Sequence, residues 1–224
     1  MILGIYGSGG LGREIYEIAI RRNTVSCNWS EIVFIDDFSE EGNYFGTKRI
    51  HFDALLKSAD YYECVIAVGE PSAREKLFLR LIEKDIKLTS LVDPTAIVSP
   101  TATIGAGSII CESSIIHTGV ELGHNTLIQP FCLVGHDVKV GDHAVLSAFC
   151  APGGGSAFGT RVYVGMQSSI IELVTIGDDA IIGMGAAVFR DVPAGVTVVG
   201  NPARITRGND EHKVFTKQKE KTDN

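Results

Sequence analysis

The chain has 224 residues, of which 45% are hydrophobic, and its formal net charge is −7. It is long and apolar enough to bury a proper core, and an acidic chain without a stripe of Lys or Arg disfavours nucleic acid as a partner. No run of eighteen apolar residues occurs, and the first residues lack a charged start and a cleavage site, so we expect a cytoplasmic protein without a membrane segment.

Strand-like and helix-like segments alternate over the first ninety residues. In chain order the pattern predicts a strand at 2–6, a helix at 13–21, strands at 32–35 and 64–68, and a helix at 71–83. Alternation of this kind is typical of a small α/β domain with a parallel sheet. We therefore predict such a domain over residues 1–90.

A glycine-rich turn joins the first predicted strand to the first helix. Gly7, Gly9 and Gly12 match G-x-G-x-x-G, which is typical of phosphate binding by backbone amides at a helix N-terminus. Asp36 lies near where an acidic residue meets the ribose of a dinucleotide, so the loop alone favours NAD. Ninety residues are only about half of a full dinucleotide domain, which favours a mononucleotide or nucleotide sugar instead. The alternative is a tight turn that binds nothing, with Asp36 and Asp37 ending a strand in solvent.

Beyond residue 90 the pattern changes to a strict period of six. An aliphatic or aromatic residue returns at every sixth position from Val98 to Val188, with Pro152 as the one break, and a small or β-branched residue follows each by four. Helices repeat at 3.6 and strands at 2, so this period predicts short strands and turns stacked as a solenoid over 91–204. Many of these aliphatic or aromatic residues are followed directly by glycine, which indicates turns that need unusual backbone angles or close approach. Residues 205–224 form a polar tail that we expect to be disordered or loosely docked.

The period also relates residues in different coils. If three six-residue sides make one coil, residues 18 apart stack, with rungs about 4.8 Å apart. Gly154, in the run Ala-Pro-Gly-Gly-Gly, then lies one rung from His136. A base beside a backbone amide that stabilises an oxyanion is what acyl transfer requires, and Asp137 is placed to hydrogen-bond the imidazole. The alternative for His136 is an exposed turn residue without a role.

Met166 and Met184 also differ by 18 positions and so share one edge of the predicted solenoid. These long apolar side chains suit a thioester or pantetheine arm, or packing against another subunit.

The cysteines, at positions 27, 64, 111, 132 and 150, show no paired metal spacing. We expect buried thiols rather than disulfides, and no metal site.

Five segments carry a resemblance to a known family: I-Y-G-S-G-G-L-G at 5–12, I-D-D-F at 35–38, A-V-G-E-P-S-A-R at 67–74, V-G-H-D-V-K-V-G-D at 134–142 and G-N-P-A-R at 200–204. Over about residues 2–204 the chain resembles the hexapeptide-repeat acyltransferases. Among these it is similar to the bacterial sugar acetyltransferases that include sialic acid O-acetyltransferase and the nucleotide-4-aminosugar N-acetyltransferases.

The resemblance implies a Rossmann-like N-terminal domain that grips a nucleotide sugar, followed by an all-β left-handed parallel β-helix. It also implies a homotrimer, with acetyl-CoA as co-substrate in a groove between neighbouring β-helices. His136 would act as base on the sugar amine, and Asp137 would increase its basicity. The other implied contacts are Gly9, Gly10 and Leu11 with the diphosphate, Asp36 and Asp37 with the nucleoside, Gly69 and Ser72 beside them, and Gly154, Met166 and Met184 with acetyl-CoA.

Two positions depart from the family pattern. Val145 stands where some amino-sugar members carry a second His that contacts the acetyl group, and the acidic partner of His136 is Asp rather than Glu. Without the second His, more of the thioester positioning falls to Gly154.

We therefore predict an acetyl-CoA-dependent N-acetyltransferase acting on the amine of a nucleotide-linked 4-amino-deoxysugar, in a cell-surface polysaccharide or glycan pathway. The alternative enzyme is an O-acetyltransferase acting on a sugar hydroxyl such as that of sialic acid, because a hydroxyl requires the same base. A rigid trimeric scaffold that senses a nucleotide through its glycine loop is the remaining alternative.

Overall fold

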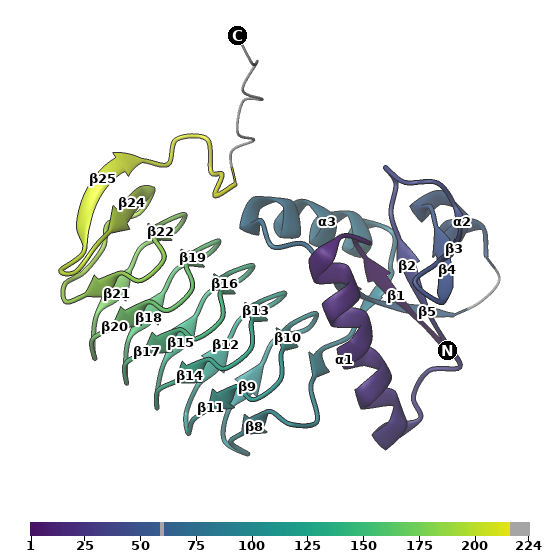
Figure 1. Cartoon of the computed structure of the whole chain (residues 1–224), viewed down its shortest axis with the longest axis horizontal. Coiled ribbons are helices and arrows are strands. Elements are labelled where there is room, and N and C mark those ends of the chain that lie inside the picture. Colours follow the sequence, from purple (N-terminus) through teal and green to yellow (C-terminus); the bar gives the residue numbers. More distant parts are fainter. Residues whose placement is uncertain (59–60, 216–224) are drawn as a thin grey trace, which may run out of the picture.

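Three helices and a six-stranded sheet make up the N-terminal part of the computed structural model (Figure 1). The structure describes residues 1–58 and 61–215. In chain order the elements are β1 (Ile2–Tyr6), α1 (Gly10–Ser26), β2 (Glu31–Ile35), β3 (Gly42–Tyr44), β4 (Thr47–Ile50), α2 (Phe52–Lys57), β5 (Tyr62–Ile66), α3 (Pro71–Glu83) and β6 (Lys87–Leu88). The sheet order is β3-β4-β2-β1-β5-β6, and every neighbouring pair is parallel except β3 with β4.

The predicted strands correspond to β1, β2 and β5, and the last predicted helix coincides with α3. All five residues of β1 are buried, which explains its uninterrupted apolar sequence. The first helix is longer than predicted, because it begins at Gly10 within the glycine loop and ends where Cys27 adopts a left-handed conformation (φ 51°). The hairpin of β3 and β4 and the short α2 were not predicted, because none of their strand residues is fully buried and no alternating apolar pattern marks them.

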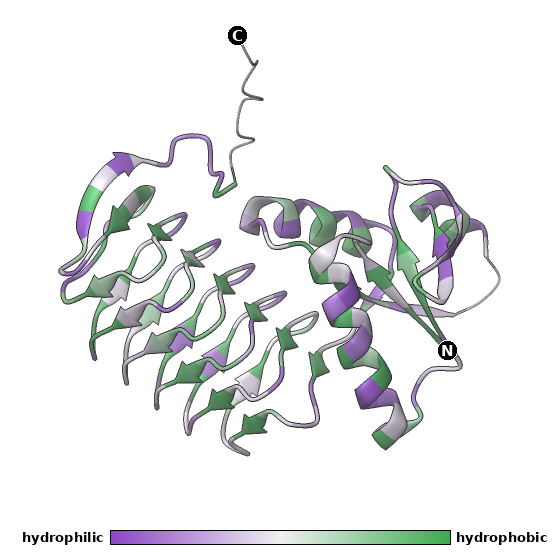
Figure 2. Cartoon of the chain, in the orientation of Figure 1, coloured by the Kyte–Doolittle hydropathy of each residue, from purple (hydrophilic) through white to green (hydrophobic). Residues whose placement is uncertain are grey.

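Residues 91–188 form a left-handed parallel β-helix in which two-residue strands alternate with four-residue turns (Figure 1). Strands pair with those 18 residues later, for example Ile116 with Val134, so the predicted coil length is confirmed. Hydrophobic residues are concentrated in the short strands of the β-helix and in the central strands of the α/β sheet (Figure 2).

The β-helix has three faces, which we name by what covers them or by their outward residues. The domain face consists of β7 (Leu91–Val92), β10 (Ile109–Ile110), β13 (Leu127–Ile128), β16 (Val145–Leu146), β19 (Tyr163–Val164), β22 (Ile181–Ile182) and β24 (Val196–Val199). The apolar face consists of β8 (Ile97–Val98), β11 (Ile115–Ile116), β14 (Leu133–Val134), β17 (Ala151–Pro152), β20 (Ser169–Ile170) and β23 (Ala187–Val188). The polar face consists of β9 (Thr103–Ile104), β12 (Glu121–Leu122), β15 (Lys139–Val140), β18 (Ala157–Phe158) and β21 (Thr175–Ile176).

The glycines that begin turns of the β-helix allow the backbones of neighbouring coils to approach closely. A Cβ at Gly141 would lie 2.6 Å from the carbonyl carbon of Gly159, and one at Gly165 would lie 2.6 Å from the backbone nitrogen of Met184. Left-handed conformations occur instead at the third residue of many turns, as at Asp137 (φ 59°). Of the two reasons that the sequence left open for these glycines, tight stacking of the coils is therefore the one that applies.

Pro152 interrupts the apolar face, as its sequence position indicated. Proline has no N–H to donate to the preceding coil, so β14 and β17 are not joined in one sheet. Two bonds in the other direction persist, since Leu133 N and Gly135 N donate to the carbonyls of Cys150 and Pro152, both at 2.9 Å. The coils therefore continue across the break.

The α/β unit and the domain face share one hydrophobic cluster. Leu3 and Ile15 from the α/β unit pack in the same cluster as Ile109, Leu127 and Val145 from the β-helix. The domain face is thus covered by the α/β unit, whereas no other element of the described residues covers the apolar and polar faces.

The described part of the C-terminal tail is ordered, so the expectation of a disordered or loosely docked segment is wrong for residues 205–215. Strand β25 (Arg204–Gly208) pairs antiparallel with β24, and residues 209–215 return to the α/β unit through hydrogen bonds. Residues 216–224 lie outside the described residues. No helix in the described ranges is long and apolar enough to cross a membrane.

All five cysteines are free thiols. Four are buried as expected, but Cys27 is exposed, because it forms the left-handed end of α1 rather than part of the core.

Candidate functional site

A cavity of about 390 Å³ opens at the carboxyl ends of β1, β2 and β5. Its walls come from the glycine loop (7–11), the end of β2 (35–38) and the loop after β5 (67–68). In the sheet β1 lies between the parallel strands β2 and β5, so the strand order reverses at β1, and such switch points are where open α/β sheets bind ligands.

The glycines of the loop serve two purposes. Gly7 has a left-handed φ of +115°, and a Cβ there would lie 2.7 Å from Ala67 O, while a Cβ at Gly12 would collide with Gly7 O. By contrast, a Cβ at Gly9 or Gly10 would meet nothing within 4 Å. The first pair thus permits the tight turn, whereas the second pair faces open space at the start of α1. The unpaired N–H groups of this helix end are available to an anion.

Asp36 holds the glycine loop in place. Its carboxylate accepts hydrogen bonds from the hydroxyl of Ser8, from Ser8 N at 3.3 Å and from Phe38 N at 3.0 Å. Burial raises the pKa of this carboxyl, but these hydrogen bonds lower it overall below its usual value. Asp36 is therefore an ionised acceptor at the edge of the cavity.

Asp37 is occupied by the protein itself. It accepts hydrogen bonds from Tyr6 Oη at 2.7 Å, Phe52 N at 2.8 Å and Arg80 Nη1 at 2.5 Å. Sequence reasoning missed Arg80, which comes from the far end of α3 and carries no local motif. Ser8 was not predicted either, although it lies inside the glycine loop at the unspecified position between Gly7 and Gly9.

The structure does not bring every predicted nucleotide-sugar residue into this cavity. Gly69 follows the cavity-lining Val68 and lies beside Leu11. Ser72 lines a different cavity of about 330 Å³, together with Arg161. The roles of Gly69 and Ser72 stay predictions.

A second candidate centre lies at the turns between the apolar and polar faces, which we call the His136 edge (turns 117–120, 135–138, 153–156 and 171–174). His136 Nδ1 lies 2.9 Å from Asp137 Oδ2. The left-handed backbone of Asp137 turns its carboxylate toward the neighbouring ring. Both side chains are largely exposed, at 66% and 70%.

The imidazole of His136 covers Gly154, as the 18-residue spacing predicts. A Cβ on Gly154 would lie 2.5 Å from His136 Nε2, so only glycine leaves room for the ring. Gly155 N donates to His136 O at 2.8 Å and fixes the two coils against each other. The base and the glycine turn are therefore direct neighbours.

The N–H of Gly154 has no acceptor among the hydrogen bonds of the described residues. At the second turn position on the edge between the polar and domain faces, two equivalent N–H groups are instead bound by the side chain 18 residues later. Asp142 accepts from His124 N at 2.7 Å, and Asp178 accepts from Thr160 N at 2.7 Å. Gly154 N–H is thus left open beside a base, which is the arrangement that an oxyanion requires.

Met166 and Met184 lie at the turns between the domain and apolar faces, which we call the Met edge (turns 129–132, 147–150, 165–168 and 183–186). Their side chains are 44% and 73% exposed. The two methionines and His136 therefore occupy opposite edges of the apolar face, with its short strands between them.

Two other histidines of the β-helix, His124 and His143, have structural partners. His143 is buried, and its Nδ1 lies 3.0 Å from the side-chain nitrogen of Asn125; burial lowers its pKa. Nδ1 of His124 accepts from Ala106 N at 3.1 Å. Val145, where relatives with a second His would carry it, is buried beneath the α/β unit in this chain.

Similarity to known proteins agrees with this architecture. A family model described as the PglD N-terminal domain matches residues 3–81. GDP-perosamine N-acetyltransferase from Escherichia coli is 28% identical over 213 residues, which cover 91% of this chain and 95% of that protein. The solved acetyltransferase domain of PglB from Neisseria gonorrhoeae, in complex with acetyl coenzyme A, has a TM-score of 0.86 and 29% identity and covers 92% of this chain and 98% of its own.

Over nine-tenths of its length the chain is similar to hexapeptide-repeat sugar acetyltransferases. A variant of perosamine N-acetyltransferase from Caulobacter crescentus, solved with CoA and GDP-perosamine, is also similar to this enzyme, with a TM-score of 0.85 and 26% identity over 92% of this chain and 97% of that chain. The predictions of the family, of the left-handed β-helix and of an acyltransferase are confirmed.

The open space at Gly9 permits a direct test of phosphate binding in this enzyme. Gly9→Asp should leave stability unchanged or raise it by a few tenths of a kcal/mol, because Asp is a favoured N-cap and no atom obstructs it. The same carboxylate should raise the KM for a nucleotide sugar about tenfold or more by repelling its diphosphate. Gly9→Asn is the matched control, since it caps the helix without charge. Equal KM values for both variants would mean that no phosphate binds here.

Proposed function

We propose that the enzyme transfers an acetyl group from acetyl-CoA to the amine of a nucleotide-linked 4-amino-deoxysugar. The observation that carries the proposal is the presence in one chain of a helix-terminus cavity suited to a diphosphate and an exposed His136–Asp137 pair beside the open N–H of Gly154. Relatives similar over nine-tenths of the chain support it, since one is bound to acetyl coenzyme A and another to CoA and GDP-perosamine.

In the proposed reaction, the sugar amine attacks the thioester carbonyl carbon, and a C–N bond forms. His136 Nε2 takes the proton from the attacking nitrogen, while Asp137 orients the ring through Nδ1. The negative charge on the carbonyl oxygen is stabilised by Gly154 N–H. Collapse of the tetrahedral intermediate breaks the C–S bond, and the leaving CoA sulfur receives the proton from His136.

The cavity offers a matching group for each part of a nucleotide sugar. The N-terminus of α1 at Gly9 and Gly10 suits the diphosphate. Asp36 suits a ribose hydroxyl, and Phe38, whose side chain is fully exposed at the cavity edge, provides a ring on which a base can stack. Asp37 acts by holding Arg80 and Tyr6 in the wall.

We further propose a homotrimer in which copies meet on the apolar face. Outward residues of this face, Ile97 and Leu133, are 64% and 46% exposed, and Phe131 and Phe149 stack on each other at its Met edge with 4.9 Å between ring centroids. An exposed apolar surface of this kind favours burial by another subunit. Acetyl-CoA would then lie along this face between copies, in reach of Met166 and Met184 and of His136.

The proposed trimer also determines how the nucleotide cavity and His136 come together. The nucleotide cavity belongs to the α/β unit on the domain face, whereas His136 lies between the other two faces. A neighbouring copy is therefore expected to bring the sugar amine to His136.

Acetyl transfer from acetyl-CoA, assayed with a panel of UDP-, dTDP-, GDP- and CMP-linked amino sugars, tests the proposal. We expect turnover of at least one 4-amino sugar, followed as release of the CoA thiol, and none of the same sugar with its amine replaced by hydroxyl. Turnover confined to hydroxyl acceptors would assign the enzyme to O-acetylation. Absence of acetyl-CoA binding by calorimetry would exclude both and favour the scaffold.

A further inference from the structure

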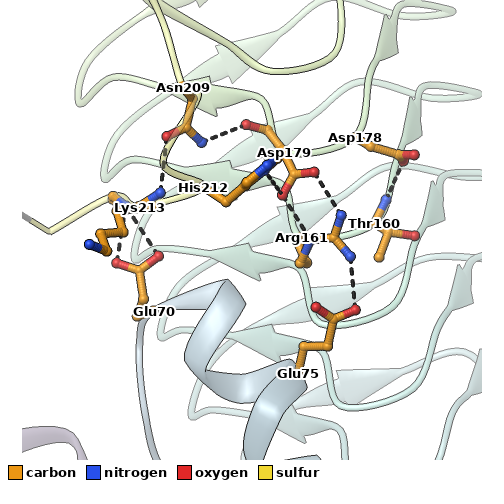
Figure 3. A network of polar contacts seen from close by, with 10 residues as sticks. Glu70, Glu75, Thr160, Arg161, Asp178, Asp179, Asn209, His212 and Lys213 are labelled. Atoms are coloured by element: carbon orange, nitrogen blue, oxygen red, sulfur yellow. Dashed lines mark hydrogen bonds and ion pairs between the residues drawn. The ribbon is translucent and has the colours of Figure 1, made fainter.

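The C-terminal segment 209–215 crosses from the last coils of the β-helix to the start of α3 (Figure 3). Asn209 fixes the beginning of the crossing. Its backbone N–H donates to Gly195 O at 2.7 Å, and its side-chain amide donates to Asp179 O at 2.9 Å. Its side-chain oxygen accepts from Lys213 N at 3.0 Å, which turns the segment toward α3.

An ion-pair network holds the middle of the segment and joins it to both parts of the chain (Figure 3). Arg161 pairs with both oxygens of Asp179, at 2.8 and 2.7 Å, and reaches Glu75 of α3 at 2.8 Å. His212 Nδ1 lies 3.1 Å from Asp179 Oδ1. The segment is thus docked on a preformed ion pair rather than on loose surface residues.

The end of the segment is held by Glu70, the residue before α3. Its carboxylate accepts from Val214 N at 3.0 and 3.1 Å and from Phe215 N at 3.0 Å. Bonds from two successive N–H groups to one ionised carboxylate are stronger than neutral hydrogen bonds. Phe215 therefore has a defined position against the α/β unit.

The ring of Phe215 lies at the rim of the nucleotide cavity. Its Cε2 is 3.8 Å from the point that a Cβ on Gly69 would occupy, and Leu11 Cδ2 is 3.9 Å from the same point. Leu11 and Val68 both line the cavity. On its other side the ring packs edge-on against Tyr163, with 5.5 Å between centroids. The Phe215 side chain remains 58% exposed, so it presents a free aromatic surface at this rim.

The strand order indicates which end of the substrate reaches this rim. The loops at the carboxyl ends of β2, β1 and β5 lie side by side in that order. In the proposed function, Asp36 and Phe38 after β2 hold the nucleoside, and the glycine loop after β1 holds the diphosphate. The sugar then extends over the loop after β5, which is where Phe215 lies.

We propose that Phe215 is a positioning and specificity residue for the sugar, and that segment 209–215 is the strap that holds it in place. The inference rests on the proposed nucleotide-sugar function. A sugar ring presents faces of C–H groups between its polar edges, and an aromatic ring of fixed orientation packs against such a face. Contact with Phe215 directs the sugar out of the cavity and orients its amine.

The test compares Phe215 variants on the best substrate of the nucleotide-sugar panel. Phe215→Ala should raise the KM for this substrate about tenfold, while the KM for acetyl-CoA stays within about twofold of wild type. The corresponding sugar-free nucleotide should bind both proteins equally by calorimetry, because Phe215 lies at the sugar end. Phe215→Tyr should keep the wild-type KM, since the ring is retained.

Two further variants separate the strap from the ring. Glu70→Ala removes the acceptor for Val214 N and Phe215 N and should raise the same KM, whereas Lys213→Ala, on the exposed side of the segment, should leave it unchanged. A nucleotide-sugar KM for folded Phe215→Ala that equals the wild-type value would overturn the proposal. An equal loss of affinity for the sugar-free nucleotide would also overturn it. Failure of the wild-type enzyme to acetylate any nucleotide sugar would instead overturn the proposed function, before any variant is compared.

Discussion

His136→Ala is expected to lower kcat by about 10²–10⁴-fold, the usual contribution of a positioned general base. The acetyl-CoA affinity measured by calorimetry should change little, because in the proposed mechanism His136 meets only the reacting atoms and not the rest of the cofactor. His117→Ala is the matched control, since His117 is exposed on the same edge in the preceding coil and its side chain has no hydrogen bond or ion pair within the described residues. A kcat for His136→Ala that equals that of the control would remove His136 from the mechanism.

Gly154→Ala tests the same centre by displacing the His136 ring instead of removing it. Its Cβ would come within 2.5 Å of His136 Nε2, so the ring must leave its position even though the base is still present. We expect a loss of kcat that approaches that of His136→Ala, with no further loss in the double variant, because both changes disable one unit. Additive losses would mean that Gly154 and His136 act independently.

Arg74→Ala is expected to lower the free energy of unfolding by about 3–5 kcal/mol, the largest effect on stability that we predict. Arg74 is fully buried in α3, and it donates to Asn125 O and Oδ1 of the β-helix at 2.7–3.0 Å and to Ile66 O and Val68 O at 2.6 and 3.1 Å. Burial lowers the pKa of Arg74 to about 9, which still leaves it charged at neutral pH. Truncation would strand these acceptors without donors and open a cavity.

Urea denaturation at a fixed protein concentration measures this effect, because oligomer stability depends on concentration. Lys76→Ala, on the exposed side of the same helix, should change the unfolding free energy by less than about 0.5 kcal/mol. Arg74→Lys should fall between the two, since it keeps a cation but loses the planar fork that serves several carbonyls. Indistinguishable stabilities for Arg74→Ala and Lys76→Ala would contradict the structural role of this side chain.

The β-helix was the most predictable part of the fold. Its parallel coils stack in register, so a spacing of 18 residues in the sequence is a spatial contact, as Ile116 and Val134 illustrate. The same reasoning applied to His136 and Gly154, which the structure brings together. It did not reveal that the N–H of Gly154 is open, because that depends on which side chains reach the turn, as one does at Thr160.

The N-terminal cavity was predictable only where residues are close in sequence. Gly9, Gly10, Leu11 and Asp36 follow directly from strand ends, and all of them line the cavity. Arg80 lines it as well, but it arrives from the end of α3, and its contact with Asp37 depends on how that helix packs on the sheet.

By itself, the sequence determined the coil geometry, the glycine loop and the pairing of His136 with Gly154, because each follows from local periodicity or from a repeat that converts spacing into contact. Only the tertiary structure decided the docking of the α/β unit and of the strap. The bonds of Arg74 to Asn125 and of Glu70 to Phe215 join residues 51 and 145 positions apart. No periodic pattern links such positions, since their contact depends on the angle at which two separately folded surfaces meet.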